Sequence, residues 1–320
     1  MGIQLSVGVV TCERPEVLEE CIKRLAVQAS GRPVEILICD TAGDDPETTA
    51  VVEKWIVKPE LTVRRVKPLR VGNISAAWEA CARSAHADAV LFLCDDGLAT
   101  EGLLDRHIEF HQAHPNGKFA LQGRITESSL SKPTPFMRWT ESSGIRFGCP
   151  DATADSVAPW LFRFMNGSVG TKEILATGFD YDFEFGGDDI DMGMRLAARG
   201  VTLAYDYDAV VEHFHPTDLP STMRKLRRYG HEGQKLRQRY PEYPQPRPPA
   251  WRHQAWAQLL TALNLLRVRP RPVREETWRF VCTQALREGL WENAVEASEP
   301  RVGARLTRIA ERDPGAAWPA

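Results

Sequence analysis

Short apolar runs alternate with segments of helical spacing through the first hundred residues, and this alternation constrains the fold more than any other feature. The segment 14–28, for example, carries apolar residues three and four positions apart, which is the spacing of one helical face. Near-continuous apolar strands that alternate with helices predict an α/β fold with a mostly parallel, Rossmann-like sheet and helices on both faces. The expected strands cover residues 5–10, 34–40, 61–67 and 89–94.

Length and composition predict a globular chain with one large domain, or one domain and an appendage. The sequence has 320 residues, of which 43% are hydrophobic and 26% charged. No run approaches the ~18 apolar residues of a membrane-spanning helix, and the N-terminus has no cationic leader, so we expect no signal peptide and a cytoplasmic location. The seven cysteines are scattered without a C-x-x-C motif, which predicts reduced thiols rather than disulfides or a zinc site.

Polar residues stand where the expected strands end. Thr11 follows the first strand, Asp40 closes the second, and Asp95 and Asp96 follow the fourth. In parallel sheets, ligands bind beyond the carboxyl ends of the strands. Any one of these acids alone could be a helix cap, and Asp40 and the nearby Asp45 are the strongest candidates for that role. Their common position at one edge instead favours a binding site.

The turn after the first strand excludes the usual glycine-rich phosphate loops. It reads "GVVTCERP", with neither G-x-G-x-x-G nor G-x-x-x-x-G-K-[ST]. If a nucleotide binds at this edge, another group must neutralise its phosphates, and a divalent cation held by carboxylates is the expected one. Such a cation would also explain why two like charges, Asp95 and Asp96, stand side by side.

A second acidic pair, Asp188 and Asp189, follows two glycines at the predicted start of a helix that ends near Gly200. Acids at a helix N-terminus can simply stabilise the helix dipole. A helix N-terminus in a cleft can also present a carboxylate to a substrate hydroxyl as a general base. The glycine content of the preceding stretch, 164–175, predicts a turn.

A predicted strand within residues 201–216 ends in two histidines, His213 and His215. Residues two apart on a strand lie on the same face. Imidazole is a common metal ligand, so these side chains are candidate partners of the acidic pairs.

In this order, the motifs resemble the inverting, metal-dependent glycosyltransferases of family 2, which have the GT-A fold. The resemblance covers residues 3–235, and its motifs are most similar to those of galactofuranosyl- and rhamnosyltransferases. It implies a catalytic domain over 1–238, with a nucleotide-binding half (1–100) and an acceptor and catalytic half (101–238). The matching stretches are "VVTCERPE", "EILICD", "LFLCDDG", "GDDIDMGMR", "VVEHFH" and "RKLRRYG".

The resemblance also implies a set of donor-binding residues. Thr11 and Arg14 would lie in the loop that lines the nucleotide pocket. Asp40 would hydrogen-bond the base or ribose of the donor, and Asp95 would sit beside the ribose and diphosphate. The donor would be a UDP-, dTDP- or GDP-linked sugar.

For catalysis, the resemblance implies a cation and a base. Asp96 would bind Mn²⁺ or Mg²⁺ with His213 as a further ligand, and His215 is the fallback for that position. Asp189 would be the general base that deprotonates the acceptor hydroxyl. Asp188 would stand in the position usually held by a glutamate.

The expected function is therefore transfer of a sugar from a nucleoside-diphosphate donor to the hydroxyl of a glycan, lipid-linked or small-molecule acceptor. Two alternatives stay open. A nucleotidyltransferase would normally carry a glycine-rich loop after the first strand, and a degenerate, non-catalytic binder is favoured by Cys94 in place of the first acid of a D-x-D motif. We expect acceptor loops within 123–165, where Trp139 and Trp160 either pack in the core or stack on a sugar ring.

The last third of the chain is basic and differs in composition from the rest. Residues 221–280 carry 14 Lys and Arg against 4 Asp and Glu, and 239–250 form a proline-rich linker. We expect a helical extension over 251–320, with Trp256 and Leu259 on an apolar helical face. It would contact an anionic membrane surface, pack on the catalytic domain, or join two copies of the chain. No nucleic-acid motif accompanies the charge, so no nucleic-acid partner is expected.

Overall fold

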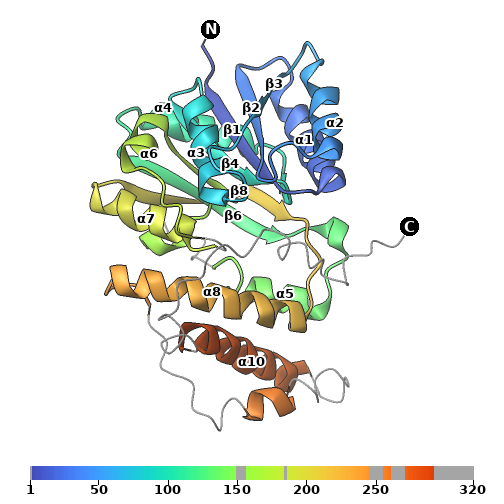
Figure 1. The fold of residues 1–320 in the computed structure, drawn as a ribbon, viewed down its shortest axis with the longest axis vertical. Coiled ribbons are helices and arrows are strands. Elements are labelled where there is room, and N and C mark those ends of the chain that lie inside the picture. The colour runs from blue at the N-terminus through green and yellow to red at the C-terminus, as the bar shows by residue number, and fades with distance from the viewer. Residues whose placement is uncertain (1, 149–155, 184–185, 245–254, 261–270, 292–320) are drawn as a thin grey trace.

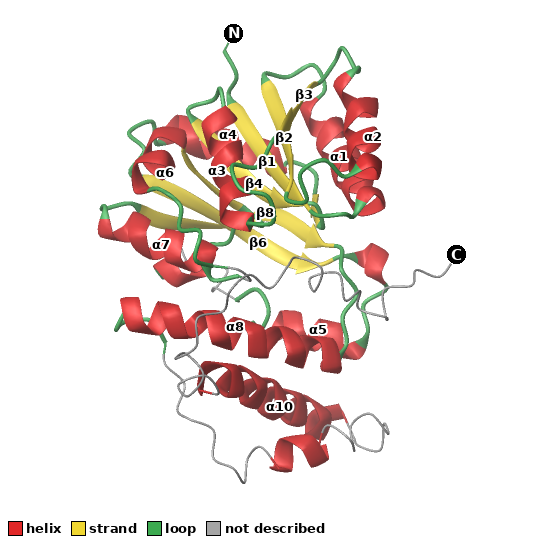
Figure 2. Ribbon diagram, viewed as in Figure 1, coloured by secondary structure: helices red, strands yellow, loops and turns green. Residues whose placement is uncertain are grey.

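The computed structural model shows an eight-stranded sheet with helices on both faces and a helical layer beside it (Figure 1; Figure 2). The strand order is β3-β2-β1-β4-β7-β6-β8-β5. The structure describes residues 2–148, 156–183, 186–244, 255–260 and 271–291. The strands are β1 (Leu5–Thr11), β2 (Val34–Asp40), β3 (Thr62–Val66), β4 (Ala89–Cys94), β5 (Gly97–Ala99), β6 (Phe119–Glu127), β7 (Gly167–Gly170) and β8 (Thr202–His213).

Helices follow most of the strands. The nine that concern the site and its support are α1 (Pro15–Ala29), α2 (Pro46–Ile56), α3 (Ile74–Ser84), α4 (Leu103–Ala113), α5 (Pro135–Ser142), α6 (Thr171–Thr177), α7 (Asp188–Ala198), α8 (Leu219–Arg239) and α10 (Arg271–Trp291).

The predicted parallel sheet is confirmed in the first half of the chain. Strand β1 pairs in parallel with β2 and β4, and β3 joins β2 at the edge of the sheet. Every residue of β1 and β2 is buried, as expected for strands covered on both faces. The same topology brings Thr11 opposite Asp40 and places Asp95 directly after β4. The strand ends therefore meet at one edge.

The turn predicted within 164–175 is confirmed only at residues 163–166, where Asn166 N donates to the carbonyl oxygen of Arg163 (3.2 Å). Residues 167–170 form β7, which lies inside the sheet and pairs antiparallel with both β4 and β6, and α6 follows at once. A Cβ atom on Gly167 would lie 2.5 Å from the carbonyl oxygen of Arg163. The glycine thus allows a close approach of two backbone segments. Glycine content alone could not separate this packing role from a turn.

Two apolar clusters lie against the sheet. One packs side chains of α1, α2 and α4 on one face, and the other packs α3, α6 and α7 on the opposite face. Helix caps fix where two of the helices begin: Asp45 accepts a hydrogen bond from Thr48 N (2.8 Å), and Asn73 accepts one from Ala76 N (2.9 Å).

A third apolar cluster joins α5, α8 and α10 below the sheet as drawn in Figure 1. The Trp139 ring lies 5.7 Å from Phe136 and 5.6 Å from Trp278, measured between ring centroids. Of the two roles left open for Trp139, the structure therefore shows core packing. The helix α8 begins with a capping box in which Asp218 and Ser221 satisfy each other's backbone groups.

The C-terminal extension is described only in part. In the short helical piece 255–260, Trp256 and Leu259 are exposed, whereas Leu260 packs against the third cluster. Most of the predicted linker 239–250 lies outside the described residues. Within the described ranges, no helix combines the length and the apolar character needed to cross a membrane.

Candidate active site

Arg14, in the turn after β1, joins the two acids that follow β4. Its Nε donates to Asp95 Oδ2 (3.1 Å) and its Nη1 donates to Asp96 Oδ2 (2.9 Å), while Nη2 contacts Asp95 Oδ1. Thr11 Oγ1 adds a hydrogen bond to Asp95 Oδ2 (2.6 Å). The structure thus brings together four of the predicted site residues and shows a guanidinium between the two adjacent carboxylates.

The end of β8 delivers His213 to the same acids. Gly97, the residue after Asp96, is the register partner of His213 in the pairing of β5 with β8. The distance from His213 Nε2 to Asp96 Oδ2 is 3.6 Å, although 117 positions separate the two residues in the sequence. The His215 ring follows at 5.7 Å from the His213 ring.

The two acids of this pair differ in their affinity for protons. Burial raises the pKa of Asp95 to about 6, although Arg14 opposes the shift. Burial also acts to raise the pKa of Asp96, but Arg14 and His213 outweigh it and hold that pKa below its ordinary value. Asp96 is therefore charged across the physiological range, which is what a cation ligand requires.

Asp40 lies at the neighbouring strand end. Its Oδ1 accepts a hydrogen bond from Ala42 N (3.0 Å), and Thr41 N donates to the carbonyl oxygen of Thr11 (2.9 Å), which ties the ends of β2 and β1 together. Burial raises the pKa of Asp40. One of its carboxylate oxygens is satisfied within its own turn, so the other is available to a ligand.

The second acidic pair opens α7. Gly186 and Gly187 have φ values of +75° and +89°, the left-handed region that glycine adopts without strain, and the helix starts directly after them. Asp189 Oδ1 accepts from Ile190 N (2.8 Å), and Asp189 Oδ2 lies 3.8 Å from Arg163 Nε. Burial and the neighbouring charge of Asp189 raise the pKa of Asp188 to about 8. Burial likewise raises the pKa of Asp189.

Both acidic pairs lie near Cys94, the last residue of β4. Burial raises the pKa of the Cys94 thiol well above its ordinary value, and nearby carboxylates raise it further. Those carboxylates include Asp96 and Asp95 from one pair and Asp188 from the other. The two pairs, about a hundred positions apart in the sequence, therefore both lie near one strand end.

Four of the predicted site residues carry a buried polar atom that has no hydrogen-bond partner among the described residues. Burying a polar group without a hydrogen-bond partner destabilises the fold, and most buried polar groups in native proteins have such a partner. These atoms are Asp40 Oδ2, Asp96 Oδ1, Asp188 Oδ2 and His213 Nδ1. Three of them lie at the ends of β2, β4 and β8 and the fourth at the start of α7, as expected for a site that binds a polar ligand. Within the described chain, no three His, Cys, Asp or Glu side chains gather closely enough to hold a metal ion by themselves.

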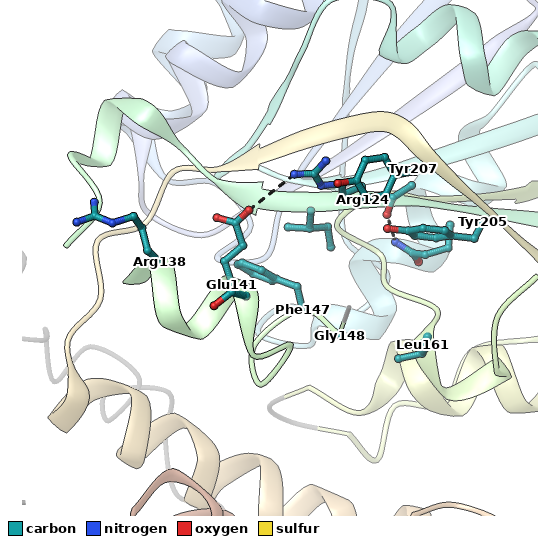
Figure 3. A pocket seen from close by; sticks show the side chains of 12 residues that line it. Arg124, Arg138, Glu141, Phe147, Gly148, Leu161, Tyr205 and Tyr207 are labelled. Carbon is teal, nitrogen blue, oxygen red and sulfur yellow. Dashed lines mark hydrogen bonds and ion pairs between the residues drawn. The ribbon is translucent and has the colours of Figure 1, made fainter. Parts of the chain in front are cut away.

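A cavity of about 380 Å³ adjoins the site between β6, β8 and the segment that contains α5 (Figure 3). Tyr205, Tyr207 and Arg124 line it from the two strands, and Glu141 and Phe147 line it from the α5 side. The Arg124 guanidinium lies 4.2 Å from the centroid of the Tyr207 ring and 3.9 Å from the Glu141 carboxylate. The cavity falls in the size range of small-molecule pockets, roughly 300–1,000 Å³.

Some residues of the site were not predicted from the sequence. Arg163 pairs with Asp189, and Arg146 lies between the ends of β6 and β8, where it pairs with Glu127. Arg14 was expected to line the nucleotide pocket, but its contact with both acids was not foreseen. These partners come from loops without any periodic pattern, so only their charge could have suggested them.

Comparison with known proteins assigns a family to the first half of the chain. Residues 6–164 match the family model described as Glycosyl transferase family 2. A curated relative, the O-antigen biosynthesis protein RfbC of Myxococcus xanthus, is 23% identical over 212 residues. The matched part is 62% of this chain but only 16% of RfbC, so the chain corresponds to a small part of that relative.

Solved structures support the same fold. The mannosyltransferase PcManGT from Pyrobaculum calidifontis, solved with GDP-Man and Mn²⁺, superposes with a TM-score of 0.62 at 16% identity, covering 92% of this chain and 88% of that one. The first 349 residues of S. aureus TarS, solved with UDP-GlcNAc, give a TM-score of 0.51 at 14% identity, covering 91% and 90%. At these identities the likeness shows a shared GT-A fold.

Proposed function

From the match of residues 6–164 to glycosyl transferase family 2 and the shared GT-A fold, we propose that the chain is a glycosyltransferase that uses a nucleotide-sugar donor and moves one sugar to an acceptor hydroxyl with inversion at the anomeric carbon. The observation that carries the proposal is the meeting of Asp95, Asp96 and His213 at one sheet edge, next to a second acidic pair on α7. The donor would lie along the ends of β1, β2 and β4.

Donor binding falls to the residues at these strand ends. The free Oδ2 of Asp40 is placed to accept a hydrogen bond from a base or ribose. Arg14 already carries a positive charge at the tip of β4, where a diphosphate would lie, and can share its five N–H donors between the acids and the phosphate oxygens. Asp95, held by Thr11 and Arg14, would border the ribose and diphosphate.

Asp96 and His213 fit a divalent cation, Mn²⁺ or Mg²⁺. They offer a charged carboxylate and a neutral imidazole 3.6 Å apart, and each has a buried atom without a partner in the described structure. Burial lowers the pKa of His213 well below its ordinary value, so its ring nitrogen stays neutral and can bind a metal. A bound cation would act as a Lewis acid toward the departing diphosphate.

Asp189 is proposed as the general base. Its raised pKa makes it a better proton acceptor than an ordinary carboxylate, and the Arg163 guanidinium keeps it oriented. As Asp189 takes the proton, the acceptor oxygen bonds to the anomeric carbon while the bond to the phosphate oxygen breaks on the opposite face. Asp188, whose pKa is about 8, stays mostly protonated at pH 7, so the pair carries a single negative charge.

The acceptor would occupy the cavity between β6, β8 and α5. Gln122, which lines the cavity, accepts a hydrogen bond from Arg163 N (2.7 Å), and Arg163 in turn contacts Asp189. On the other side, the ring of Phe147 lies 5.2 Å from the ring of His213. Tyrosine faces beside charged side chains suit a sugar ring, because its C–H face is apolar and its hydroxyls are polar.

Release of nucleoside diphosphate from a panel of UDP-, GDP- and dTDP-sugars tests the proposal. We expect release with at least one donor in Mn²⁺ or Mg²⁺, its loss in EDTA, and its loss in Asp96→Ala. The contact of Arg14 with Asp96 favours one alternative, a non-catalytic binder, because the guanidinium competes with a cation for that carboxylate. Nucleotide binding without any release would support that alternative against the proposed transfer.

A further inference from the structure

Arg146, just after α5, contacts the ends of two neighbouring strands. Its side chain is only 12% exposed and forms an ion pair with Glu127, the last residue of β6, whose side chain is 1% exposed. Its Nη2 also donates to the carbonyl oxygen of His215, two residues beyond the end of β8 (3.3 Å). A single buried guanidinium thus bridges the two strand ends, and we refer to Arg146, Glu127 and the His215 carbonyl as the arginine clasp.

The clasp borders His213 directly. Glu127 and His213 are register partners in the parallel pairing of β6 with β8, so they are neighbours across the strands. Ser128 N donates to the carbonyl oxygen of His213 (3.1 Å), and the Phe147 ring packs against the imidazole. The imidazole is therefore held from this side by two consecutive residues, Arg146 through the backbone and Phe147 through its ring.

Backbone hydrogen bonds fix the opposite side of His213. Phe214 N donates to the carbonyl oxygen of Asp96 (2.7 Å), and Gly97 pairs with His213 across β5. These bonds set the distance between Asp96 and His213, but they leave the imidazole free to turn about its own side-chain bonds. The Phe147 ring packs against the imidazole on the remaining side and so limits that rotation, and the Arg146 guanidinium lies 5.0 Å from the centroid of the Phe147 ring.

We propose that Arg146 is a positioning residue for the cation site: it holds the end of β8 and the Phe147 ring so that His213 Nε2 faces Asp96. The inference rests on the proposed function, in which those two side chains bind a divalent cation. Groups that orient a ligating histidine usually change metal affinity about 10–100-fold when they are removed. Glu127 contributes through Arg146, because their ion pair anchors the guanidinium to β6.

Mn²⁺ affinity in the presence of UDP or GDP, measured by electron paramagnetic resonance of free Mn²⁺, tests this role without relying on turnover. We expect Arg146→Met to raise the Mn²⁺ dissociation constant about 10–100-fold. Arg146→Lys should recover part of that loss, because one ammonium cannot serve both Glu127 and the His215 carbonyl as a planar guanidinium does. Metal-free nucleotide binding should be unchanged in both variants.

Arg199→Met is the control. Arg199 forms an ion pair with Glu173 (2.7 Å) that is more exposed than the Arg146–Glu127 pair, and neither residue belongs to the site. Its Mn²⁺ affinity should equal that of the unaltered protein. Glu127→Gln is a second, milder variant that keeps the shape of the side chain and weakens the ion pair, so it serves if Arg146→Met does not fold.

The outcomes separate this inference from the proposed function. If the unaltered protein binds no Mn²⁺ with any nucleotide, the metal site itself is refuted. If it binds Mn²⁺ and both Arg146→Met and Glu127→Gln bind it equally well, the positioning role is refuted while the proposed function stands. An equal loss in Arg199→Met would assign the effect to general destabilisation and would also overturn the inference.

Discussion

Asp95–Asp96 and Asp188–Asp189 are the same short sequence, two adjacent aspartates, in two different environments. The first pair has a guanidinium, a threonine hydroxyl and an imidazole beside it, and the charge of the guanidinium keeps Asp96 ionised. Among the described residues, the second pair has one arginine at 3.8 Å and hydrogen bonds from backbone groups, and burial raises both of its pKa values. One pair is built to keep negative charge, and the other to keep a proton.

The groups that contact an acidic pair, and not its sequence, therefore decide its chemistry. A pair with fixed cationic partners can bind a metal or a diphosphate through charge. A pair with a single, more distant cationic partner retains a proton at neutral pH and can exchange it with a substrate. The proposed cation site and general base follow from this contrast.

The largest expected effect is a loss of sugar transfer when the second acidic pair is altered. Asp189→Asn removes the proton acceptor while keeping the shape of the side chain, so transfer should fall about 10²–10⁴-fold. Nucleotide affinity should be unchanged, because the donor lies along other strand ends. Steady-state transfer and calorimetric nucleotide binding measure the two quantities. Asp208→Asn, an exposed acid paired with Arg106, is the control; retained transfer in Asp189→Asn would remove the base assignment.

In Arg14→Met, the first acidic pair should retain a proton at neutral pH, as the second pair does. Breaking a fully buried ion pair costs about 3–5 kcal/mol, and the loss here should be smaller because the Arg14 side chain is 36% exposed to solvent. Asp95, whose pKa is already about 6, should then keep its proton at neutral pH.

Because protonation relieves the repulsion between Asp95 and Asp96, the destabilisation by Arg14→Met should be larger at pH 8 than at pH 5. Urea unfolding at the two pH values measures it. An equal loss of stability at both would show that Arg14 does not set the charge of the pair.

A pair of buried histidines tests the effect of burial on pKa separately from the effect of charged partners. His107 and His111 both contact Ser168, and burial lowers the pKa of His107 to about 4 and that of His111 to about 3. The unfolded chain therefore binds more protons than the folded protein below pH ~6.5, the ordinary pKa of histidine. Folding stability should fall as the pH drops from ~6.5 toward 4, by up to about 1.4 kcal/mol per pH unit for each histidine.

Urea unfolding between pH 7 and pH 4.5 checks this slope. His107→Gln keeps a polar side chain and removes one titrating group, so its slope should be shallower. An unchanged slope would show that other groups control the acid sensitivity of the fold.

The smallest effect is expected from Asp188→Asn at high pH. Ionising Asp188 in the folded protein is unfavourable, so its stability contribution is intact below its unfolded pKa of ~4 and is lost as the pH rises through about 8. Asparagine removes that penalty. The melting temperature of the variant should exceed that of the unaltered protein by about 2–4 °C at pH 9 and match it near pH 4.5. A lower melting temperature at pH 9 would contradict the assignment.

The sequence predicted the half of the fold that follows simple patterns. The strands 5–11, 34–40 and 89–94 show as apolar runs, and their parallel pairing explains why Asp40, Asp95 and Asp96 meet at one edge. The short strands β5 and β7 were not predicted, because three or four residues with glycine carry no periodic signal.

The same limit applies to the site. Motif resemblance singled out the acids and His213, whereas their cationic partners, Arg146 and Arg163, come from irregular segments. Their positions depend on how distant loops pack, which a pattern in one sequence does not encode. The distance between His213 and Asp96 likewise required the antiparallel register of β5 and β8.

The most direct test of the account is where Mn²⁺ binds when a nucleoside diphosphate is present. In protein labelled with ¹⁵N at histidine, Mn²⁺ should broaden the side-chain signal of His213 first, that of the neighbouring His215 next, and leave the exposed His86 sharp. The variant His213→Asn identifies the signal, and Asp96→Asn should abolish the broadening. A His213 signal that stays sharp at saturating Mn²⁺ and nucleotide would contradict the proposal that Asp96 and His213 share one cation.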